Sequence, residues 1–328
     1  MRTRLMVSVG IAMVVIATGC AGQGEPQADA EAAAVESSEP FEADNCGAHV
    51  TVEEPPERIV TVKSSTTELV LALGAGDRLV AWAYPDGPPP DEYQAIVDEL
   101  PVLSDRVPSN EAVLDMEPDL VYAGWESNLT TDGAGTRESF HDLDIATFIA
   151  PSACEDPEYQ PNPLTFDDVF AEIEQVGELL GTPEEAAQLI EEQQERLDDI
   201  STSDGGFTAL WYSSATDIPF VGAGIGAPQM VMEAVGLDNI AADVEDTWTS
   251  MSWEAVADAD PDVIVLVDAE WNSADQKIDL LTSGSVTSQL TAVQEERYLI
   301  VPFATTEAGV RSVEAVEILA EQLEDATP

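Results

Sequence analysis

The chain has 328 residues, and its 65 acidic side chains outnumber the 11 basic ones to give a formal net charge of -54 at pH 7. Such a surface repels nucleic acids and anionic lipid headgroups, which excludes nucleic acid as a partner. With only two histidines and three cysteines, the chain lacks the ligands that a bare transition-metal ion needs, so we expect neither a resident metal nor a cofactor.

The first twenty residues have the pattern of a secretory signal. Arg2 and Arg4 precede an apolar run over residues 5–16, which small residues separate from Cys20. The run is shorter than the roughly 20 apolar residues that span a bilayer. A cysteine in this place resembles the bacterial lipobox, in which it is lipidated and becomes the first residue of the mature protein. We predict a signal peptide over residues 1–19 and an extracytoplasmic protein anchored to the cell membrane through Cys20; the alternative is cleavage with loss of Cys20.

The segment that follows the signal is acidic and low in hydrophobicity. Residues 21–44 hold seven acidic residues, no basic ones and many Ala, Ser and Pro. Such a composition cannot bury enough apolar surface to order the chain. We predict a disordered acidic tether over residues 20–45.

Three cysteines in an exported chain leave one without a partner. Lipidation of Cys20 accounts for the odd one, and Cys46 and Cys154 are then free to pair in an oxidising compartment. We predict a Cys46–Cys154 disulfide, and two buried free thiols are the alternative.

An internal repeat organises the remaining residues. Residues 109–119 (SNEAVLDMEPD) and 252–262 (SWEAVADADPD) share seven of eleven positions, and each reads as a helix that ends before proline. An apolar run follows each copy, at 120–123 and 263–267, as is typical of a buried parallel strand.

A second pair of matching elements lies upstream of the repeat copies. Residues 69–74 and 231–236 read as apolar helices that end in a C-terminal glycine. Two ordered matches predict two related α/β lobes, which we place at residues 46–163 and 182–328.

The segment between the lobes has helical periodicity instead. Its apolar residues recur at helical spacing, Thr165 is a suitable N-cap and Gly181 a suitable end. We predict a connecting helix over residues 164–181, which permits small rocking of the lobes rather than wide closure.

A glycine-rich segment offers a rival interpretation. Gly222, Gly224 and Ala227 fit the dinucleotide pattern G-x-G-x-x-A. The segment does not follow a long buried strand, so we interpret it as a loop with unusual backbone angles before a helix that starts at Pro228.

Several segments, in order along residues 50–325, carry a family resemblance. They are residues 57–62 (ERIVTV), 64–69 (SSTTEL), 73–78 (LGAGDR), 111–119, 239–240, 252–262 and 311–314 (RSVE). The ordered set resembles the iron-siderophore and cobalamin class of ABC-importer binding proteins, class III of the periplasmic binding proteins. The resemblance implies an α/β fold of two lobes, each with a mainly parallel sheet flanked by helices. It also implies a single long rigid helix between the lobes and a ligand held in the cleft.

The predicted strands place the same cleft independently, because open α/β sheets bind ligands beyond the carboxyl ends of their strands. Aromatic residues concentrate at these ends, which indicates a pocket of flat apolar faces. Trp248 joins them because relatives place a ligand-facing tryptophan in the corresponding loop. The candidate ligand-binding residues are Lys63, Ser64, Tyr84, Trp125, Tyr212, Trp248, Trp271, Phe303 and Arg311. The alternative is that each ring packs in its own lobe, which we favour for Trp82 and Trp211.

The resemblance implies that the ligand is a metal chelate. Ferric catecholates are anionic and need clustered Arg or Lys, whereas only Lys63, Arg106, Arg137 and Arg311 lie near the strand ends. A neutral or cationic chelate fits better, so we predict a ferric siderophore first, with cobalamin or haem as the alternative. A lipid-anchored hydrolase is the remote alternative, without a G-x-S-x-G motif in its support, and we expect no enzyme.

The resemblance also implies that the protein delivers its ligand to the permease subunits of an ABC importer. In the family one acidic residue on each lobe makes that contact, and Glu138 and Glu233 lie in the corresponding helices. We expect a monomer that docks through these two carboxylates.

Overall fold

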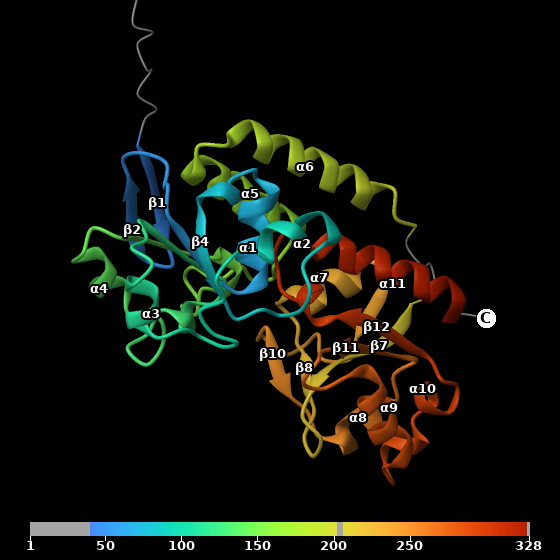
Figure 1. Ribbon diagram of the computed structural model, residues 1–328. Coiled ribbons are helices and arrows are strands. Elements are labelled where there is room, and N and C mark those ends of the chain that lie inside the picture. Colours follow the sequence, from blue (N-terminus) through green and yellow to red (C-terminus); the bar gives the residue numbers. More distant parts are fainter. Residues whose placement is uncertain (1–39, 202–205, 327–328) are drawn as a thin grey trace, which may run out of the picture. The chain divides into compact units, whose positions relative to one another are not determined.

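A computed structural model describes residues 40–201 and 206–326; the predicted signal peptide, Cys20 and most of the predicted tether lie outside them. Two larger sheets, a two-stranded N-terminal hairpin and the helices around them make up these residues (Figure 1). No helix in the described ranges is long and apolar enough to cross a membrane.

The first sheet has four parallel strands in the order β4-β3-β5-β6. Every residue of β3 and β5 is buried, as expected for inner strands covered on both faces. The strands are β3 (Ile59–Val62), β4 (Leu79–Ala83), β5 (Leu120–Ala123) and β6 (Ala146–Ile149). The helices are α1 (Ser64–Ala72), α2 (Asp91–Val97), α3 (Asn110–Leu114) and α4 (Arg137–His141), with 3-10 turns η1 (Gly76–Arg78), η2 (Glu126–Asn128) and η3 (Pro151–Ala153).

The second sheet is mixed, in the order β10-β8-β7-β11-β12 with β9 paired to β7. Strands β9, β7, β11 and β12 run parallel, while β8 is antiparallel to both of its neighbours, β7 and β10. The strands are β7 (Phe207–Ser214), β8 (Phe220–Gly222), β9 (Leu237–Asn239), β10 (Trp248–Ser250), β11 (Val263–Asp268) and β12 (Tyr298–Pro302). The helices are α7 (Ala227–Ala234), α8 (Trp253–Ala259), α9 (Ala274–Ser283), α10 (Thr291–Gln294) and α11 (Ser312–Ala326), with 3-10 turns η4 (Thr287–Gln289) and η5 (Phe303–Thr305).

The two repeat copies form the same local structure in the two sheets. Ser109 caps α3 by accepting a hydrogen bond from the Ala112 amide, and Ser252 caps α8 in the same way from Ala255. Each helix leads into a buried parallel strand, β5 or β11. The predicted repeat is therefore confirmed as a pair of equivalent αβ units.

The chain passes between the sheets through two helices. Helix α5 (Phe166–Leu180) has Thr165 as its N-cap, which forms a capping box with Asp168. Its C-cap is Gly181, in the left-handed conformation with φ 69°. Helix α6 (Pro183–Asp198) follows after two residues. The helix predicted over 164–181 is present as α5, but a single long helix between the lobes is not confirmed, and the lobe boundaries stay a prediction.

An N-terminal hairpin corrects the predicted end of the tether. Strand β1 (Phe41–Asn45) pairs antiparallel with β2 (Ala48–Val52) within residues that include the last part of the predicted tether. Contacts distant in the sequence order it. The Asn45 side chain pairs with both backbone groups of Ile149, and the predicted Cys46–Cys154 disulfide is formed in the structure.

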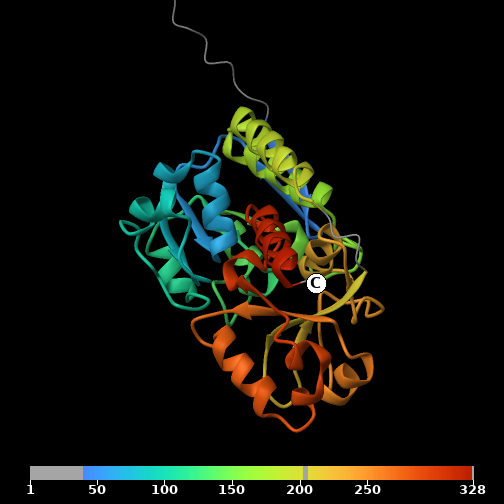
Figure 2. The ribbon, with the colours of Figure 1, turned by 90° about the vertical axis from the view of Figure 1, so that its right-hand side faces the viewer.

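The main hydrophobic core is continuous between the sheets. It takes Tyr122 from β5, Ile173 from α5 and Val265 from β11, and all three are buried. Helix α11 packs against α6 and α7 and extends this core (Figure 2).

The glycine-rich segment is a close-packed loop between β8 and α7. A Cβ on Gly224 would lie 2.0 Å from the Ala242 carbonyl oxygen, and a Cβ on Gly226 would lie 3.0 Å or less from Thr247 atoms. The prediction of unusual backbone angles was wrong, because these glycines allow the 242–247 backbone to approach rather than supply a positive φ.

Candidate ligand-binding site

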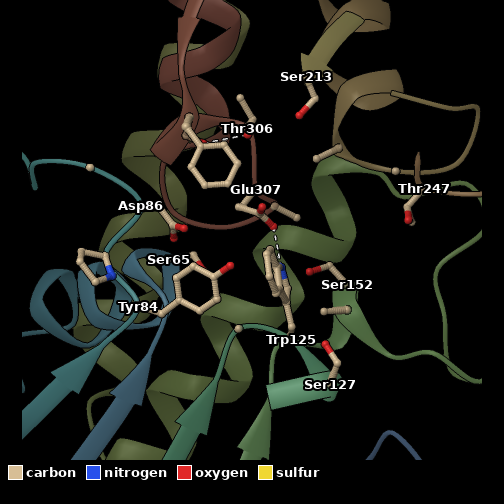
Figure 3. Close-up of a pocket in the computed structure, with 18 of the residues that line it drawn as sticks. Ser65, Tyr84, Asp86, Trp125, Ser127, Ser152, Ser213, Thr247, Thr306 and Glu307 are labelled. Atoms are coloured by element: carbon tan, nitrogen blue, oxygen red, sulfur yellow. Dashed lines mark hydrogen bonds between the residues drawn. The ribbon is translucent and has the colours of Figure 1, made fainter. Parts of the chain in front are cut away.

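A cavity of about 1250 Å³ lies beyond the carboxyl ends of the parallel strands of both sheets. Ser65 lines it from the first turn of α1, which follows β3, and Tyr84 and Trp125 line it from the segments after β4 and β5 (Figure 3). Ser213 and Phe303 line it from the ends of β7 and β12. The location of the cleft that the sequence predicted is thus reproduced, with walls from both repeat units.

Aromatic pairs form much of the wall. Tyr84 and Trp125 meet edge to face with ring centroids 5.5 Å apart, and Trp271 and Phe303 do the same at 5.8 Å. Trp248 stacks on Phe220 at 5.7 Å with an interplanar angle of 16°. The structure therefore brings five of the predicted aromatic residues to one cavity, where flat faces are open to a ligand.

Phe220 was missed by the sequence analysis. It lies on β8, which pairs antiparallel with β10, and this pairing brings it onto the ring of Trp248. Neither strand shows a strong apolar run, so the pairing carries no local sequence signal.

The polar part of the lining is acidic. Among the described residues, seven carboxylates line the cavity: Asp86, Asp98, Asp105, Glu126, Glu155, Glu270 and Glu307. Arg106 is the only basic residue among the described lining residues. Low-dielectric walls focus the field of these groups, so the cavity favours positive charge.

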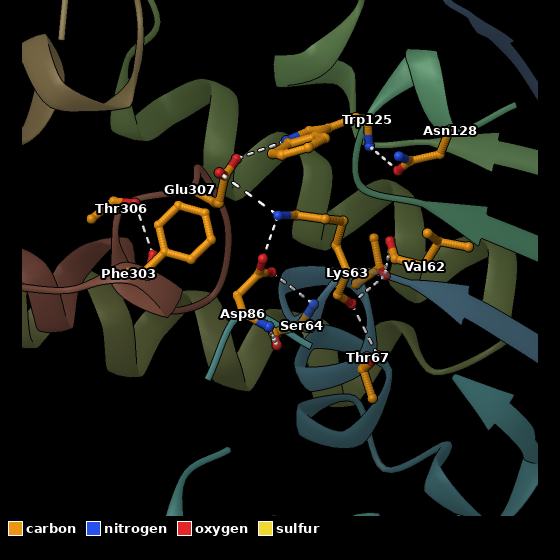
Figure 4. A network of polar contacts seen from close by, with 11 residues as sticks. Val62, Lys63, Ser64, Thr67, Asp86, Trp125, Asn128, Phe303, Thr306 and Glu307 are labelled. Atoms are coloured by element: carbon orange, nitrogen blue, oxygen red, sulfur yellow. Dashed lines mark hydrogen bonds and ion pairs between the residues drawn. The ribbon is translucent and has the colours of Figure 1, made fainter. Parts of the chain in front are cut away.

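Lys63 and Ser64 lie behind the wall rather than in it. Both are buried, and the Lys63 ammonium donates to the Asp86 carboxylate (Figure 4). The Ser64 amide donates to the same carboxylate at 3.1 Å, and the Ser64 hydroxyl accepts from the Asp86 amide at 2.9 Å. Burial raises the pKa of Asp86 to about 6, although the Lys63 charge opposes that shift.

Glu307 links the two walls. Its carboxylate accepts from the Trp125 indole Nε1 at 2.9 Å and lies 3.9 Å from the Lys63 Nζ. Glu307 follows β12, whereas Trp125 follows β5, so a polar contact crosses the cavity between the two sheets.

Tyr212 does not line the cavity, so its predicted ligand contact is not supported. It is 1% exposed, its ring packs edge to face on Trp253, and its hydroxyl donates to the Ala215 carbonyl oxygen. The reason is strand length, because β7 continues to Ser214 and places Ser213 at the cavity instead.

Arg311 also lies outside the lining. It pairs with Glu314 at 2.6 Å and approaches Glu68 on α1 at 3.6 Å. The guanidinium therefore joins the start of α11 to α1.

The two predicted docking residues are exposed on different helices. Glu138 lies on α4 beside the first sheet, and Glu233 lies on α7 beside the second. Glu233 accepts a hydrogen bond from Gln229 at 2.7 Å. Their role in docking stays a prediction.

The sequence profile of the periplasmic binding protein family matches residues 59–304, which include every strand of the two larger sheets and end before α11. The chain belongs to the periplasmic binding protein family. It is 28% identical over 323 residues to the ABC transporter substrate-binding lipoprotein YvrC of Bacillus subtilis, whose function is uncharacterised, with 95% of each chain covered. It is 28% identical over 281 residues to a cobalamin-binding protein of Halobacterium salinarum, covering 80% of this chain and 69% of that one.

A solved structure shares the fold closely. The Fe3+-hydroxamate transport protein of Saccharomonospora viridis superposes with a TM-score of 0.76 at 26% identity, covering 87% of this chain and 99% of that one. This periplasmic binding protein is therefore an extracytoplasmic substrate-binding component of an ABC importer, and not an enzyme. Within the described ranges no cluster of three His, Cys, Asp or Glu side chains is arranged to hold a metal ion.

Proposed function

We propose that this protein captures a bulky metal chelate with zero or positive net charge, first of all a ferric siderophore of the hydroxamate type. It then delivers the chelate, as a monomer, to its importer. The acidic, aromatic-walled cavity carries this proposal.

The size of the cavity supports a bulky ligand. At about 1250 Å³ it exceeds the roughly 300–1,000 Å³ of pockets for drug-sized molecules. Hydroxyl groups of Ser65, Ser152, Ser213 and Thr247 line it beside the rings, in positions to donate to carbonyl or hydroxamate oxygens (Figure 3).

The charge of the cavity supports a chelate without net negative charge. Three hydroxamates neutralise Fe3+, and a siderophore with a free amine becomes cationic. A ferric tris-catecholate is a trianion, and haem carries two propionates, so either would meet seven carboxylates with Arg106 as the sole opposite charge among the described lining residues.

Cobalamin is the second candidate. Relatives from Halobacterium and Yersinia are named as cobalamin- or vitamin B12-binding proteins. The uncharged carboxamides around a corrin ring suit the hydroxyl groups and flat faces of the cavity wall, and its size suits the cavity volume.

A matched pair of ligands tests the charge argument. One ferric trihydroxamate is titrated with its terminal amine free and then succinylated, with tryptophan fluorescence and calorimetry as readouts. Cyanocobalamin, haem and a ferric tris-catecholate complete the set. We expect the cationic form to bind with a Kd of about 1 µM or tighter, and the succinylated form more weakly.

Neutralising exposed lining carboxylates provides the control. The double variant Glu155→Gln and Glu270→Gln should narrow the difference between the two forms, because both carboxylates face the cavity. Tightest binding of the tris-catecholate would refute the proposal, and tightest binding of cyanocobalamin would select the second candidate.

We propose a lipid on Cys20 as the means of attachment, on the sequence pattern of the signal and on the lipoprotein relative in Bacillus subtilis. Cys20→Ala should release the protein from membrane fractions with its chelate affinity unchanged. Detergent partitioning measures this, and a Cys20→Ala protein that stays in the detergent phase would reject the anchor.

A further inference from the structure

Lys63 is a fully buried cation at the back of the cavity wall. It is one of only two lysines in the chain, and its side chain is 0% exposed. Its backbone has φ 94° and ψ 150°, a conformation that is essentially reserved for glycine. Tyr84, at the end of the neighbouring strand, also has a positive φ of 58°. Strained residues of this kind persist only where the surroundings determine them, and they cluster at functional sites.

Three cavity-lining rings surround the ammonium group of Lys63. Its Nζ lies 3.7 Å from the ring centroid of Trp125, 4.6 Å from that of Tyr84 and 5.1 Å from that of Phe303. Rings attract a cation through their negative faces, and the attraction grows when the cation is removed from water. Asp86 and Glu307 supply the opposite charges (Figure 4).

The Trp125 indole is held from several sides by this arrangement. Its Nε1 donates to Glu307, its face lies over the Lys63 ammonium, and the Tyr84 ring meets it edge to face. Gly124 makes room for the lysine stem, because a Cβ there would lie 2.9 Å from the Lys63 Cβ and Cγ. The indole borders the cavity, so its orientation determines the surface that a ligand meets.

We propose that Lys63 is a positioning residue, an internal cation that holds Trp125, Tyr84 and Phe303 as a preformed stacking surface for the chelate. The identity of the ligand in this inference rests on the proposed function, whereas the arrangement of Lys63 and the rings does not depend on it. Asp86 from the first sheet's loops and Glu307 from the second anchor the cation on both sides of the cavity. A wall fixed before binding loses less conformational entropy when the chelate stacks on it.

Lys63→Met tests the role of the charge with little change in side-chain length. We expect chelate affinity to fall roughly tenfold, the cost of losing a desolvated cation beside the rings. The near-UV circular dichroism of Trp125 is obtained by subtracting the spectrum of a Trp125→Phe variant, once for the parent and once for Lys63→Met. This Trp125 signal should be strong in the parent and weak in Lys63→Met. Lys277→Met is the matched control, since the other lysine is also buried beside Tyr212 and Trp271 but donates to the backbone carbonyls of Val267 and Asn272.

A second variant keeps the test valid if Lys63→Met fails to fold around unpaired carboxylates. Lys63→Met combined with Asp86→Asn removes both partners of the buried pair, which is tolerated better than removing one. The same losses of affinity and of Trp125 dichroism are expected in the double variant.

Chemical rescue separates a positioning cation from a merely structural lysine. Lys63→Ala leaves a space that propylammonium matches in length and charge, and 1-propanol matches in length alone. Propylammonium should restore the Trp125 dichroism and the chelate affinity, whereas 1-propanol should not. Unchanged affinity and dichroism in Lys63→Met, or equal rescue by the alcohol, would overturn the inference.

The two proposals fail separately in this design. If the parent protein binds none of the chelates, the proposed function is wrong, yet the Trp125 dichroism and its rescue by propylammonium still report on Lys63. If the parent binds a chelate and Lys63→Met binds it equally well, only the positioning role is rejected.

Discussion

Tyr122 on β5 donates its hydroxyl hydrogen to the carboxyl group of Glu172 on α5 at 2.6 Å, and both side chains are buried. This contact ties the connecting helix to an inner strand of the first sheet. Burial raises the pKa of Glu172 to about 7 from an ordinary value of 4.5, although the hydrogen bond from Tyr122 opposes the shift.

The Glu172 carboxyl predicts a decrease of stability with rising pH. Because its folded pKa is raised, the folded state holds a proton that the unfolded state releases between pH 4.5 and about 7, so stability falls as pH rises through that window. Glu172→Gln should remove this slope. The free energy of unfolding of the variant, measured against that of the parent, should therefore be higher above the window than below it, by up to about 3 kcal/mol. Denaturant melts across the pH range measure it, and parallel pH profiles for parent and variant would contradict the assignment.

We predict that the contribution of Arg311 to stability depends on pH, because Arg311 lies beside the Glu68 carboxyl. Glu68 is 2% exposed, neither of its oxygens has a hydrogen-bond partner, and burial raises its pKa to about 8 against the opposing charge of Arg311. Arg311→Gln should therefore cost more stability at about pH 9, where Glu68 is charged, than at about pH 6, where it is protonated. Glu314→Gln is the comparison variant: it removes the partly exposed partner of Arg311 and also a charge that raises the Glu68 pKa, so its stability cost should be smaller at about pH 9 than at about pH 6. An equal cost at both pH values would refute a protonated Glu68.

The aromatic wall predicts the effect of removing single rings. Trp125→Ala and Trp248→Ala should each weaken chelate binding by about 1–3 kcal/mol, because both rings border the cavity and have partners that hold them in place. Trp253→Phe is the control, since Trp253 packs on Tyr212 and donates to the Thr216 carbonyl oxygen away from the lining. Calorimetry gives affinity and thermal melts give stability. A wall variant with parent affinity and a much lower melting temperature would reassign its tryptophan to the core.

The Cys46–Cys154 disulfide predicts a large stability loss on its removal. The bond closes a loop with a sequence separation of 108, for which the chain-entropy model gives about 4–5 kcal/mol. Cys46→Ser combined with Cys154→Ser should lower the melting temperature by about 10 °C or more. Non-reducing peptide mass mapping checks the pairing directly. Two thiols that alkylate in the native parent protein would contradict it.

We predict that reversing the exposed charges on α4 and α7 changes uptake by cells without changing chelate affinity. Glu138→Lys combined with Glu233→Lys should reduce chelate uptake by cells and leave chelate affinity unchanged, because an ion pair at an interface acts on docking. Glu99→Lys combined with Glu321→Lys reverses two other exposed charges and is the control. Uptake equal to the parent in the first double variant would reject this docking pair.

The repeat and the helix ends could be predicted because their signals are local. Ser109 and Ser252 cap helices by accepting hydrogen bonds from amides three residues away, and Gly181 ends α5 because it adopts the left-handed conformation. The inner strands are continuous apolar runs because helices cover both faces of each sheet, so their burial is visible in the sequence. The place of the cavity follows from the same elements, since parallel strands end at one edge.

Other features depended on contacts that no local pattern contains. Asn45 and Cys46 hold the β1-β2 hairpin through partners that lie more than 100 residues away in the sequence. The composition of residues 20–45 contains no sign of these contacts and therefore predicted a tether. Tyr212 was misplaced because the exact end of β7 is set by its pairing with β8, which extends the strand to Ser214.

The sequence by itself determined that the chain forms two related α/β units of the siderophore and cobalamin class of binding proteins, with aromatic residues at its strand ends. Only the tertiary structure decided that Lys63 is enclosed by those rings, that Glu307 accepts the Trp125 indole hydrogen bond, and which seven carboxylates of the described residues line the cavity. The physical reason is that charge in this chain is spread along the whole sequence and has no period. A carboxylate acquires a role only when strand order brings it beside a cation or a cavity from a distant part of the chain.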